Sequence, residues 1–355
     1  MSTSSNVPTE FADAVFGSAL GYFRILSMYL GLRLGLYEEL RDAGGLSAGE
    51  LAIRAGIAER YAREWLEQQT TNGVLELDAG SAPHTFRLPA RHAEVLLDQD
   101  SLAFAGAAIR QLASLRGVVD HVAEAFRHGG GVPAEAFGEE GADGQGGANR
   151  PTFLTTLPND WLPAIEPFHT RLGAGPARVL DIGCGHGWSS IAVAKAYPHA
   201  RVDGFDPDLR SVERARLHAA EMGVDDRVHF HSVDAATIEG PADLAMAFEC
   251  VHDMSDPVSV LRAARRALID DGAMLVVDER TRDVFDGAPH DLESYFYGWS
   301  IFDCLPAGMA SQPSAATGTV MRPETLKGYA GAAGFTRFDV LPIEHDAFRL
   351  YLLRP

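Results

Sequence analysis

Paired cysteines, a secretory leader and long apolar runs are all missing from this sequence of 355 residues. Its three cysteines, Cys184, Cys250 and Cys304, are far apart, which argues against a disulfide framework and a cysteine-rich zinc site. The first ten residues lack the basic and then apolar order of a secretory signal. No window reaches the roughly 18 uninterrupted apolar residues of a membrane helix. We therefore expect a cytoplasmic protein that binds no membrane.

Positive charge is also scarce. The chain has 30 lysines and arginines against 49 acidic residues, which gives a formal net charge of −19. Such a charge repels phosphate backbones, so nucleic acid is disfavoured as a partner. The hydrophobic fraction of 46% is ordinary for a globular protein, and the length suggests about two domains.

The first helical region, residues 11–40, is apolar on more than one side. Large apolar residues recur from Phe11 through Leu26 to Leu40, so we expect this segment to be buried on several sides. Either the same chain or a second subunit can provide that cover, and we favour the second. The sequence therefore predicts a homodimer whose interface includes this region.

Residues 46–98 have the pattern of a winged helix. Ser47 can cap a helix over Ala48–Ala55, a second helix follows over Glu59–Asn72, and two short strands are expected at Val74–Leu77 and Thr85–Leu88. A helix-turn-helix suggests DNA binding. However, this region has eight acidic residues against five arginines, whereas a DNA reader needs the opposite balance. We therefore favour a scaffolding or dimerisation role.

A glycine-rich stretch over residues 128–150 separates this helical part from the rest of the chain. It is too long for a passive connection, and it is either a disordered linker or a mobile cover over a site. We predict a helical and winged-helix dimerisation domain over 1–127, a loop and bridging helix over 128–172, and a catalytic domain over 173–355.

From Arg178 onward, short apolar strands alternate with helices. Strands are expected at Val179–Ile182, Arg201–Phe205, Val228–His231, Leu244–Phe248 and Met274–Val277. This rhythm predicts a buried parallel sheet with helices on both faces. Two further strands, Phe335–Pro342 and Ala347–Leu353, read as a closing antiparallel hairpin. The fold class is therefore α/β, a Rossmann-like doubly wound sheet behind a mainly helical N-terminal domain.

A glycine loop follows the first of these strands. Its sequence, Asp181-Ile182-Gly183-Cys184-Gly185-His186-Gly187, has the spacing Gly-x-Gly-x-Gly, and Trp188 stands where a dinucleotide fingerprint has its third glycine. Asp206 follows the second strand, where an acid can accept both ribose hydroxyls of a nucleoside. Asp234 follows the third strand, where a carboxylate can accept a hydrogen bond from an adenine amino group.

With these motifs, residues 178–280 resemble class I S-adenosylmethionine-dependent methyltransferases. The resemblance implies S-adenosylmethionine as cofactor, with Asp206 on its ribose and Asp234 on its adenine. It also implies that further residues line the cofactor: Asp181, Gly183, Gly185, Gly187 and Phe248. An NAD-binding or nucleotide-free α/β domain is the alternative.

A second motif follows the fourth strand. The segment His252-Asp253-Met254-Ser255-Asp256 resembles the His-Asp-Trp-Ser-Asp segment of plant-type small-molecule O-methyltransferases, with Met254 in place of tryptophan. That family also has an N-terminal winged-helix dimerisation domain, so the resemblance extends over most of the chain. It implies that His252 is a general base, a role that suits imidazole near neutral pH.

Asp253 completes the predicted catalytic pair, and Asp278 and Glu279 are candidates for the acidic partner of His252. Other roles for His252 remain open. It can cap the helix that starts near Pro257. With Asp253 and His290 it can also form a two-histidine, one-carboxylate metal site, as in some related iron-dependent C-methyltransferases.

Aromatic residues after the fifth strand are expected to complete an acceptor pocket or, alternatively, plain core. The predicted pocket residues are Trp161, Tyr295, Trp299, Phe302 and Met309. We conclude that the sequence predicts methylation of a small aromatic or apolar acceptor, on oxygen. The rivals are a metal-dependent C-methyltransferase and a winged-helix transcriptional regulator, and the acceptor itself is not specified by the fold.

Overall fold

The computed structural model of the protein describes residues 7–355, and its Cα positions divide the chain into two compact units. The first unit ends at Ser114, and the second runs from Leu115 to Pro355. The expected domain boundary was residue 127, so residues 115–127 lie in the second unit.

The first unit contains the expected winged helix. Ser47 accepts a hydrogen bond from the N–H of Glu50 and donates its own N–H to the Glu50 carboxylate, which is a capping box at the start of α3. The two strands of the wing pair antiparallel, with Leu77 opposite Phe86. The elements are α1 (Val7–Arg33), α2 (Leu36–Ala43), α3 (Ala48–Ala55), α4 (Glu59–Thr71), β1 (Glu76–Asp78), β2 (Thr85–Arg87), α5 (Ala90–Leu97) and α6 (Gly106–Ser114).

Helix α1 differs from the expectation of burial on several sides. Only its C-terminal part packs against the core of the first unit, with Ile25, Leu26 and Met28 partly buried and Tyr29 and Leu32 buried. Earlier aromatic side chains are largely exposed: Phe11 is 70% exposed, Phe16 64% and Phe23 61%. By length and composition alone, Thr9–Arg33 is also long and apolar enough to cross a membrane, although it contains no long uninterrupted apolar run. The described residues of the same chain therefore do not cover this segment.

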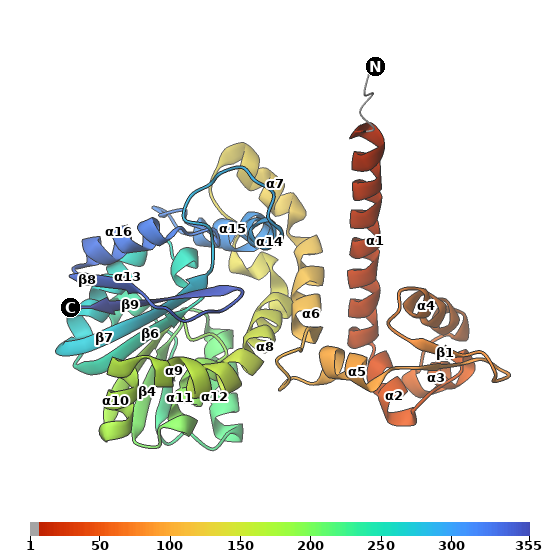
Figure 1. Cartoon of the computed structure of the whole chain (residues 1–355), viewed down its shortest axis with the longest axis horizontal. Helices are drawn as coiled ribbons and strands as arrows, with labels where there is room; N and C mark the ends of the chain where they lie inside the picture. Colours follow the sequence, from red (N-terminus) through yellow and green to blue (C-terminus); the bar gives the residue numbers. More distant parts are fainter. Residues whose placement is uncertain (1–6) are drawn as a thin grey trace. The chain divides into compact units, whose positions relative to one another are not determined.

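A seven-stranded sheet forms the centre of the second unit (Figure 1). Its strand order is β5-β4-β3-β6-β7-β9-β8, and all pairings are parallel except those of β9 with β7 and β8. The predicted doubly wound sheet with a closing antiparallel hairpin is confirmed. The strands are β3 (Ala177–Ile182), β4 (Ala200–Phe205), β5 (Val228–His231), β6 (Ala242–Phe248), β7 (Leu268–Glu279), β8 (Arg337–Val340) and β9 (Phe348–Arg354).

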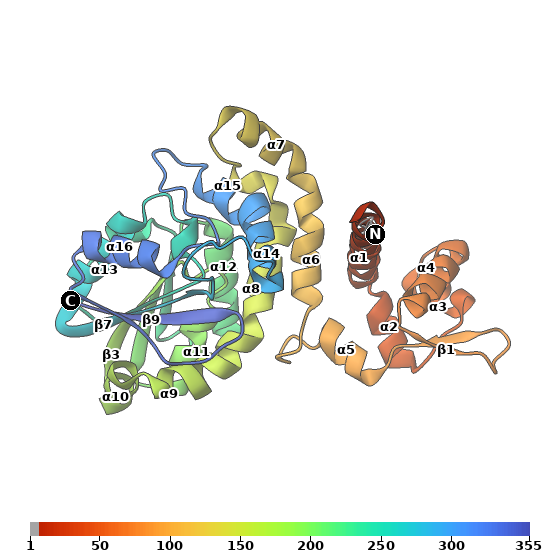
Figure 2. The same ribbon diagram turned by 45° about the horizontal axis from the view of Figure 1, so that its top comes forward.

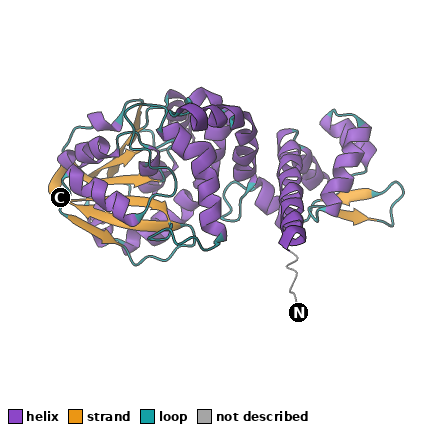
Figure 3. Cartoon of the chain, turned by 90° about the horizontal axis from the view of Figure 1, so that it is seen from above, coloured by secondary structure: helices purple, strands orange, loops and turns teal. Residues whose placement is uncertain are grey.

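Helices cover both faces of this sheet (Figures 1 and 3). One face packs against α10 (Glu166–Ala174), α11 (Trp188–Ala196) and α12 (Leu209–Glu221). The other face packs against α13 (Pro257–Ala267) and α16 (Pro323–Ala333). Two apolar cores, one on each side of the sheet, therefore fix the strands from both faces.

The remaining helices of the second unit lie toward one end of the sheet (Figure 2). They are α7 (Val119–His128), α8 (Gly138–Thr156), α14 (Asp291–Trp299) and α15 (Leu305–Gly308), whereas the short α9 (Leu162–Ala164) lies beside α10. Two turns of π-helix, Leu157–Trp161 and Ser300–Cys304, extend α8 and α14.

The glycine-rich stretch is largely helical, so the expectation of a loop or linker is wrong for α8. This helix contains five glycines and Pro151, each of which lowers intrinsic helix stability. Contacts with the rest of the unit provide the compensation. A Cβ atom on Gly146 would overlap the ring of His186, which shows how closely α8 packs on the glycine loop. Arg150 also lies over the Trp188 ring, 4.5 Å from its centroid.

Candidate active site

A cavity of about 570 Å³ lies at the carboxyl ends of the central strands. One wall is made by the residues that follow β3, β4, β5 and β6, and the other wall is made by α8 and α15. Ligands of doubly wound sheets bind at this edge. The cavity is therefore where the sequence motifs predicted it.

The glycine loop passes along this cavity in a conformation that requires glycine. Gly183, Gly185 and Gly187 all have positive φ angles, of 66°, 47° and 80°. A Cβ atom on Gly183 would come within 2.7 Å of the Cys250 sulfur, so the loop packs directly against the residues after β6. A Cβ atom on Gly185 would meet nothing within 4 Å, so this backbone faces open space.

Two carboxylates hold the loop. Asp181 is buried and accepts hydrogen bonds of 2.6 Å from the hydroxyls of Ser189 and Ser190. Burial raises the pKa of Asp181 to about 6 in spite of these bonds. Asp206 accepts the N–H of Gly185 at 2.9 Å, and each of its oxygens keeps a free lone pair. Burial also raises the pKa of Asp206 above its usual value.

Most of the predicted cofactor residues line the cavity. They are Gly183, Gly185, Asp206, Asp234 and Phe248. Asp234 is exposed at the start of a short 3-10 turn, where it accepts the N–H of Ala236. Asp181 and Gly187 do not line the cavity, because Asp181 lies beneath the loop and Gly187 begins α11. Their place is to support the loop.

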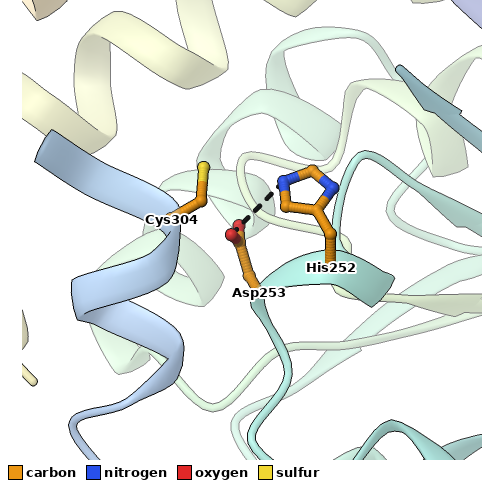
Figure 4. A group of neighbouring side chains, drawn as sticks. All are labelled: His252, Asp253 and Cys304. Atoms are coloured by element: carbon orange, nitrogen blue, oxygen red, sulfur yellow. Dashed lines mark ion pairs between the residues drawn. The ribbon is translucent and has the colours of Figure 1, made fainter. Parts of the chain in front are cut away.

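His252 stands at the other end of the same edge, in a buried network of acids. Its Nδ1 lies 2.8 Å from Asp278 Oδ1 and 3.2 Å from Glu279 Oε2. Its Nε2 lies 3.3 Å from Asp253 Oδ1 (Figure 4). His252 is 2% exposed, whereas Asp253 lines the cavity. Both acids that were candidates for the partner of His252 are therefore at the ring.

The charges of this network oppose the effect of burial on the pKa of His252. Burial alone lowers the pKa of His252, but Asp278, Glu279 and Asp253 together raise it well above its ordinary value. Burial and the neighbouring Asp278 raise the pKa of Glu279, while the imidazole holds the pKa of Asp278 below its usual range despite burial. These directions favour a protonated imidazole next to an ionised Asp278.

The positions of neighbouring residues bear on two alternative roles of His252, as a helix cap and as a metal ligand. The side chain that caps α13 is Asp256, which accepts the N–H of Ser259, so His252 is not the helix cap. His290 is exposed and caps α14 through its own Nδ1. Among the residues that the structure describes, the third possible ligand beside His252 and Asp253 is Cys304, not His290 (Figure 4).

None of the five residues predicted for the acceptor pocket lines this cavity. Trp161 is 2% exposed in the sheet core, where it packs edge-on against Phe348. Tyr295 and Trp299 pack on each other. The π-helical turn that follows Trp299 changes the helical register. Phe302 packs against a small apolar cluster that contains Val118. Met309 also lies outside the lining, and α15 instead brings Ala307 and Gly308 to the cavity.

Sequence reasoning missed several lining residues. Those from α8 and α15, or directly after α15, are Ala142, Gln145, Gly146, Asn149, Phe153, Ala307, Gly308 and Ser311. No motif identified them, because α8 reads as a linker. Phe153 packs on Phe248 with ring centroids 5.0 Å apart. Glu249 also lines the cavity, and its place directly after β6 was an available signal.

Comparison with known families agrees with this geometry. The methyltransferase domain family matches residues 176–310, and the Rv2258c-like winged helix-turn-helix domain matches residues 24–97. The chain carries an S-adenosylmethionine-dependent methyltransferase domain. The predicted resemblance is therefore confirmed, and so is the presence of a winged-helix domain at its N-terminal side.

Curated relatives match only part of this chain in sequence, whereas solved structures match its fold over nearly the whole length. The 27-O-demethylrifamycin SV methyltransferase of Amycolatopsis mediterranei is 38% identical over 127 residues, 35% of this chain and 44% of that protein. The first curated relatives are thus matched over less than half of their length. The mitomycin 7-O-methyltransferase MmcR covers 98% of both chains, with a TM-score of 0.74 and 21% identity. PigF with S-adenosylhomocysteine gives a TM-score of 0.75 at 19% identity, covering 97% of this chain and 99% of that one.

Proposed function

We propose that the protein transfers a methyl group from S-adenosylmethionine to a hydroxyl of a small aromatic or apolar acceptor, with His252 as the general base. The observation that carries the proposal is the hydrogen bond between His252 and Asp278 at the edge of a cavity bordered by the glycine loop. The names of several relatives, which are O-methyltransferases, also favour oxygen as the nucleophile.

The cofactor fits the first half of the cavity. Asp206 has free lone pairs for the two ribose hydroxyls, and the open backbone at Gly185 allows close approach. Asp234 is placed to accept from the adenine, and Phe248 gives an apolar surface near the glycine loop. Bound there, the cofactor supplies an activated methyl group, so the protein's task is to position the acceptor and remove its proton.

His252 is the group that takes this proton. Asp278 orients the ring through Nδ1, which leaves Nε2 as the atom that faces Asp253. A hydroxyl becomes a better nucleophile as it loses its proton, and a base whose pKa is raised holds that proton more strongly. The same raised pKa means that the fraction of free imidazole, and with it the supply of base, increases as the pH rises.

Asp253 stands between Nε2 and the cavity. The acceptor must therefore displace its carboxylate or pass the proton through it. Burial raises the pKa of Asp253, which suits transient protonation. Asp253→Asn should lower turnover without weakening cofactor binding, and equal turnover of the variant and the wild type would remove Asp253 from the proton path.

A panel of small phenols and alcohols tests the function as a whole. We expect S-adenosylhomocysteine to form with at least one hydroxyl acceptor and the product to gain one methyl group, measured by mass spectrometry. Reaction should continue in the presence of chelators. If chelation abolishes activity and added iron restores it, a metal-dependent mechanism replaces the general base.

The exposed face of α1 supports a homodimer in which a second copy covers it. Its large side chains Phe11, Phe16 and Phe23 are mostly exposed within the described chain, and exposed apolar patches mark interaction surfaces. Light scattering should give a dimer for the wild type and a monomer for Phe16→Glu. Tyr61→Glu, at another exposed aromatic of the same unit, should remain a dimer. A monomeric wild type at micromolar concentration would contradict the proposal.

A further inference from the structure

Glu249 is a cavity residue to which the proposed mechanism gives no task. It is the first residue after β6, and its N–H donates to the carbonyl of Val277 at 2.8 Å, which fixes the backbone. Its φ angle is 49°, in the left-handed region that residues with side chains rarely adopt. Strain of this kind persists where the surrounding structure enforces it, and it is concentrated at functional sites.

The order of strands gives Glu249 a defined position along the cavity edge. Four neighbouring strands of the sheet stand in the order β4-β3-β6-β7. Asp206 follows β4, the glycine loop follows β3 and Glu249 follows β6. Asp278 is the last residue but one of β7. Asp278 in turn holds His252. Glu249 therefore stands between the residues assigned to the nucleoside and the residues assigned to the acceptor proton.

The reacting sulfur of the cofactor must also lie between the residues assigned to the nucleoside and the residues assigned to the acceptor proton. Methyl transfer needs the acceptor oxygen in line with the carbon–sulfur bond, next to the base. The nucleoside is proposed to bind at Asp206, and the base is His252. A cofactor bound in this way would have its sulfur near the end of β6, where Cys250 packs against Gly183 and Glu249 lines the cavity.

Charge makes the position of Glu249 significant. The sulfur of S-adenosylmethionine carries a positive charge, and that of S-adenosylhomocysteine carries none. The described residues that line the cavity include no lysine or arginine, and two of its acidic residues, Glu249 and Asp253, follow β6. We propose that Glu249 is the counter-ion of the sulfonium, and that it makes the site prefer the methyl donor over the spent product.

This residue acts on binding and not on the covalent step. When the methyl group moves to the acceptor, the electron pair of the carbon–sulfur bond stays on sulfur and the positive charge disappears. The attraction to Glu249 disappears with it, which favours release of the product. The inference rests on the proposed function in two respects, the cofactor in this cavity and His252 as the base that fixes where the acceptor lies.

The groups that face Glu249 make its charge sensitive to pH. They are His252 and Asp253 after β6, Asp278 and Glu279 on β7, and Gln145 of α8. Burial, with the charges of Asp278 and Asp253, raises the pKa of Glu249 to about 8, although His252 and Gln145 oppose this. Glu249 is then protonated in slightly acidic solution and ionised in basic solution, so its attraction for a cation is gained as the pH rises.

Isothermal titration calorimetry of the full chain tests the proposal without an acceptor. S-adenosylmethionine and S-adenosylhomocysteine share the same amino-acid end, so the ratio of their dissociation constants isolates the sulfonium. From about pH 6 to about pH 9, we expect the preference for the methyl donor to rise about tenfold, the factor given by one unit of pKa change. Near neutral pH, the methyl donor should also release more protons than the product.

Glu249→Gln should remove both effects, and Glu249→Asn, which tolerates a positive φ, is a second variant with the same expectation. Glu213→Gln, on the exposed face of α12, should keep them. An unchanged ratio and unchanged proton release in folded Glu249→Gln would overturn the inference while leaving the proposed function intact. If neither ligand binds the wild type, the proposed function fails and the inference fails with it.

Discussion

The two walls of the cavity differ in how they are held. The strand-end wall grows out of β3, β4 and β6, which are buried on both faces and hydrogen-bonded to neighbours. The helical wall consists of α8, with five glycines and Pro151, and of the four-residue α15. The strand-end wall is therefore held by the sheet itself, whereas the helical wall depends on its contacts with the strand-end wall. This difference implies that the sheet fixes the chemistry and that the helices adapt to the ligand.

The largest effect should come from the strand-end wall. His252→Ala removes the proposed base, so turnover should fall by roughly 10²–10⁴-fold, while affinity for S-adenosylhomocysteine stays unchanged. Kinetics with an identified acceptor and calorimetry would measure the two quantities. His199→Ala, at an exposed turn, is the matched control and should behave as the wild type. Normal turnover in His252→Ala would exclude the base.

An intermediate effect should come from the helical wall. Gly146→Ala places a methyl group against the His186 ring, which must push α8 away from the glycine loop. Overpacking of about 1–3 kcal/mol exceeds the roughly 1 kcal/mol that alanine adds to helix stability. Cofactor affinity should fall about tenfold. Gly328→Ala on α16, where a Cβ atom meets nothing within 4 Å, should leave it unchanged. Equal affinity in both variants would show that the two walls are independent.

The smallest effect is a shift in pH dependence. Because the carboxylates around His252 raise its pKa, the rate should increase with pH through a range above the ordinary histidine value of 6.5. Asp278→Asn removes the nearest of these charges, so the rising limb of the pH–rate profile should move toward acid. A profile that stays in place would mean that another group titrates.

The same contrast explains how far the sequence could predict the molecule. Apolar runs predicted the strands of the second unit. The short motifs after these strands predicted the positions of Asp206, Asp234 and His252. These signals are local, because a buried strand needs consecutive apolar residues and its end must face the cavity edge. The winged helix was predictable for a similar reason, since Ser47 caps α3 with side-chain chemistry that is visible in the sequence.

The helical wall could not be predicted in this way. Glycines in α8 read as a linker, and only the close approach of Gly146 to His186 gives them a packing reason. The aromatic residues after β7 were assigned to the pocket by helical spacing, but the π-helical turn at Ser300–Cys304 breaks that spacing. In both cases the decisive information is a contact between distant parts of the chain, which no local pattern contains.

Titration of the cofactor into wild type and Asp206→Ala tests the central claim most directly, that this cavity holds S-adenosylmethionine by its ribose. Asp206→Ala should weaken binding by about 1.5–3 kcal/mol, the worth of hydrogen bonds to a charged group. Asp225→Ala, at an exposed turn after α12, should bind as the wild type does. Unchanged affinity in a folded Asp206→Ala variant would contradict the account.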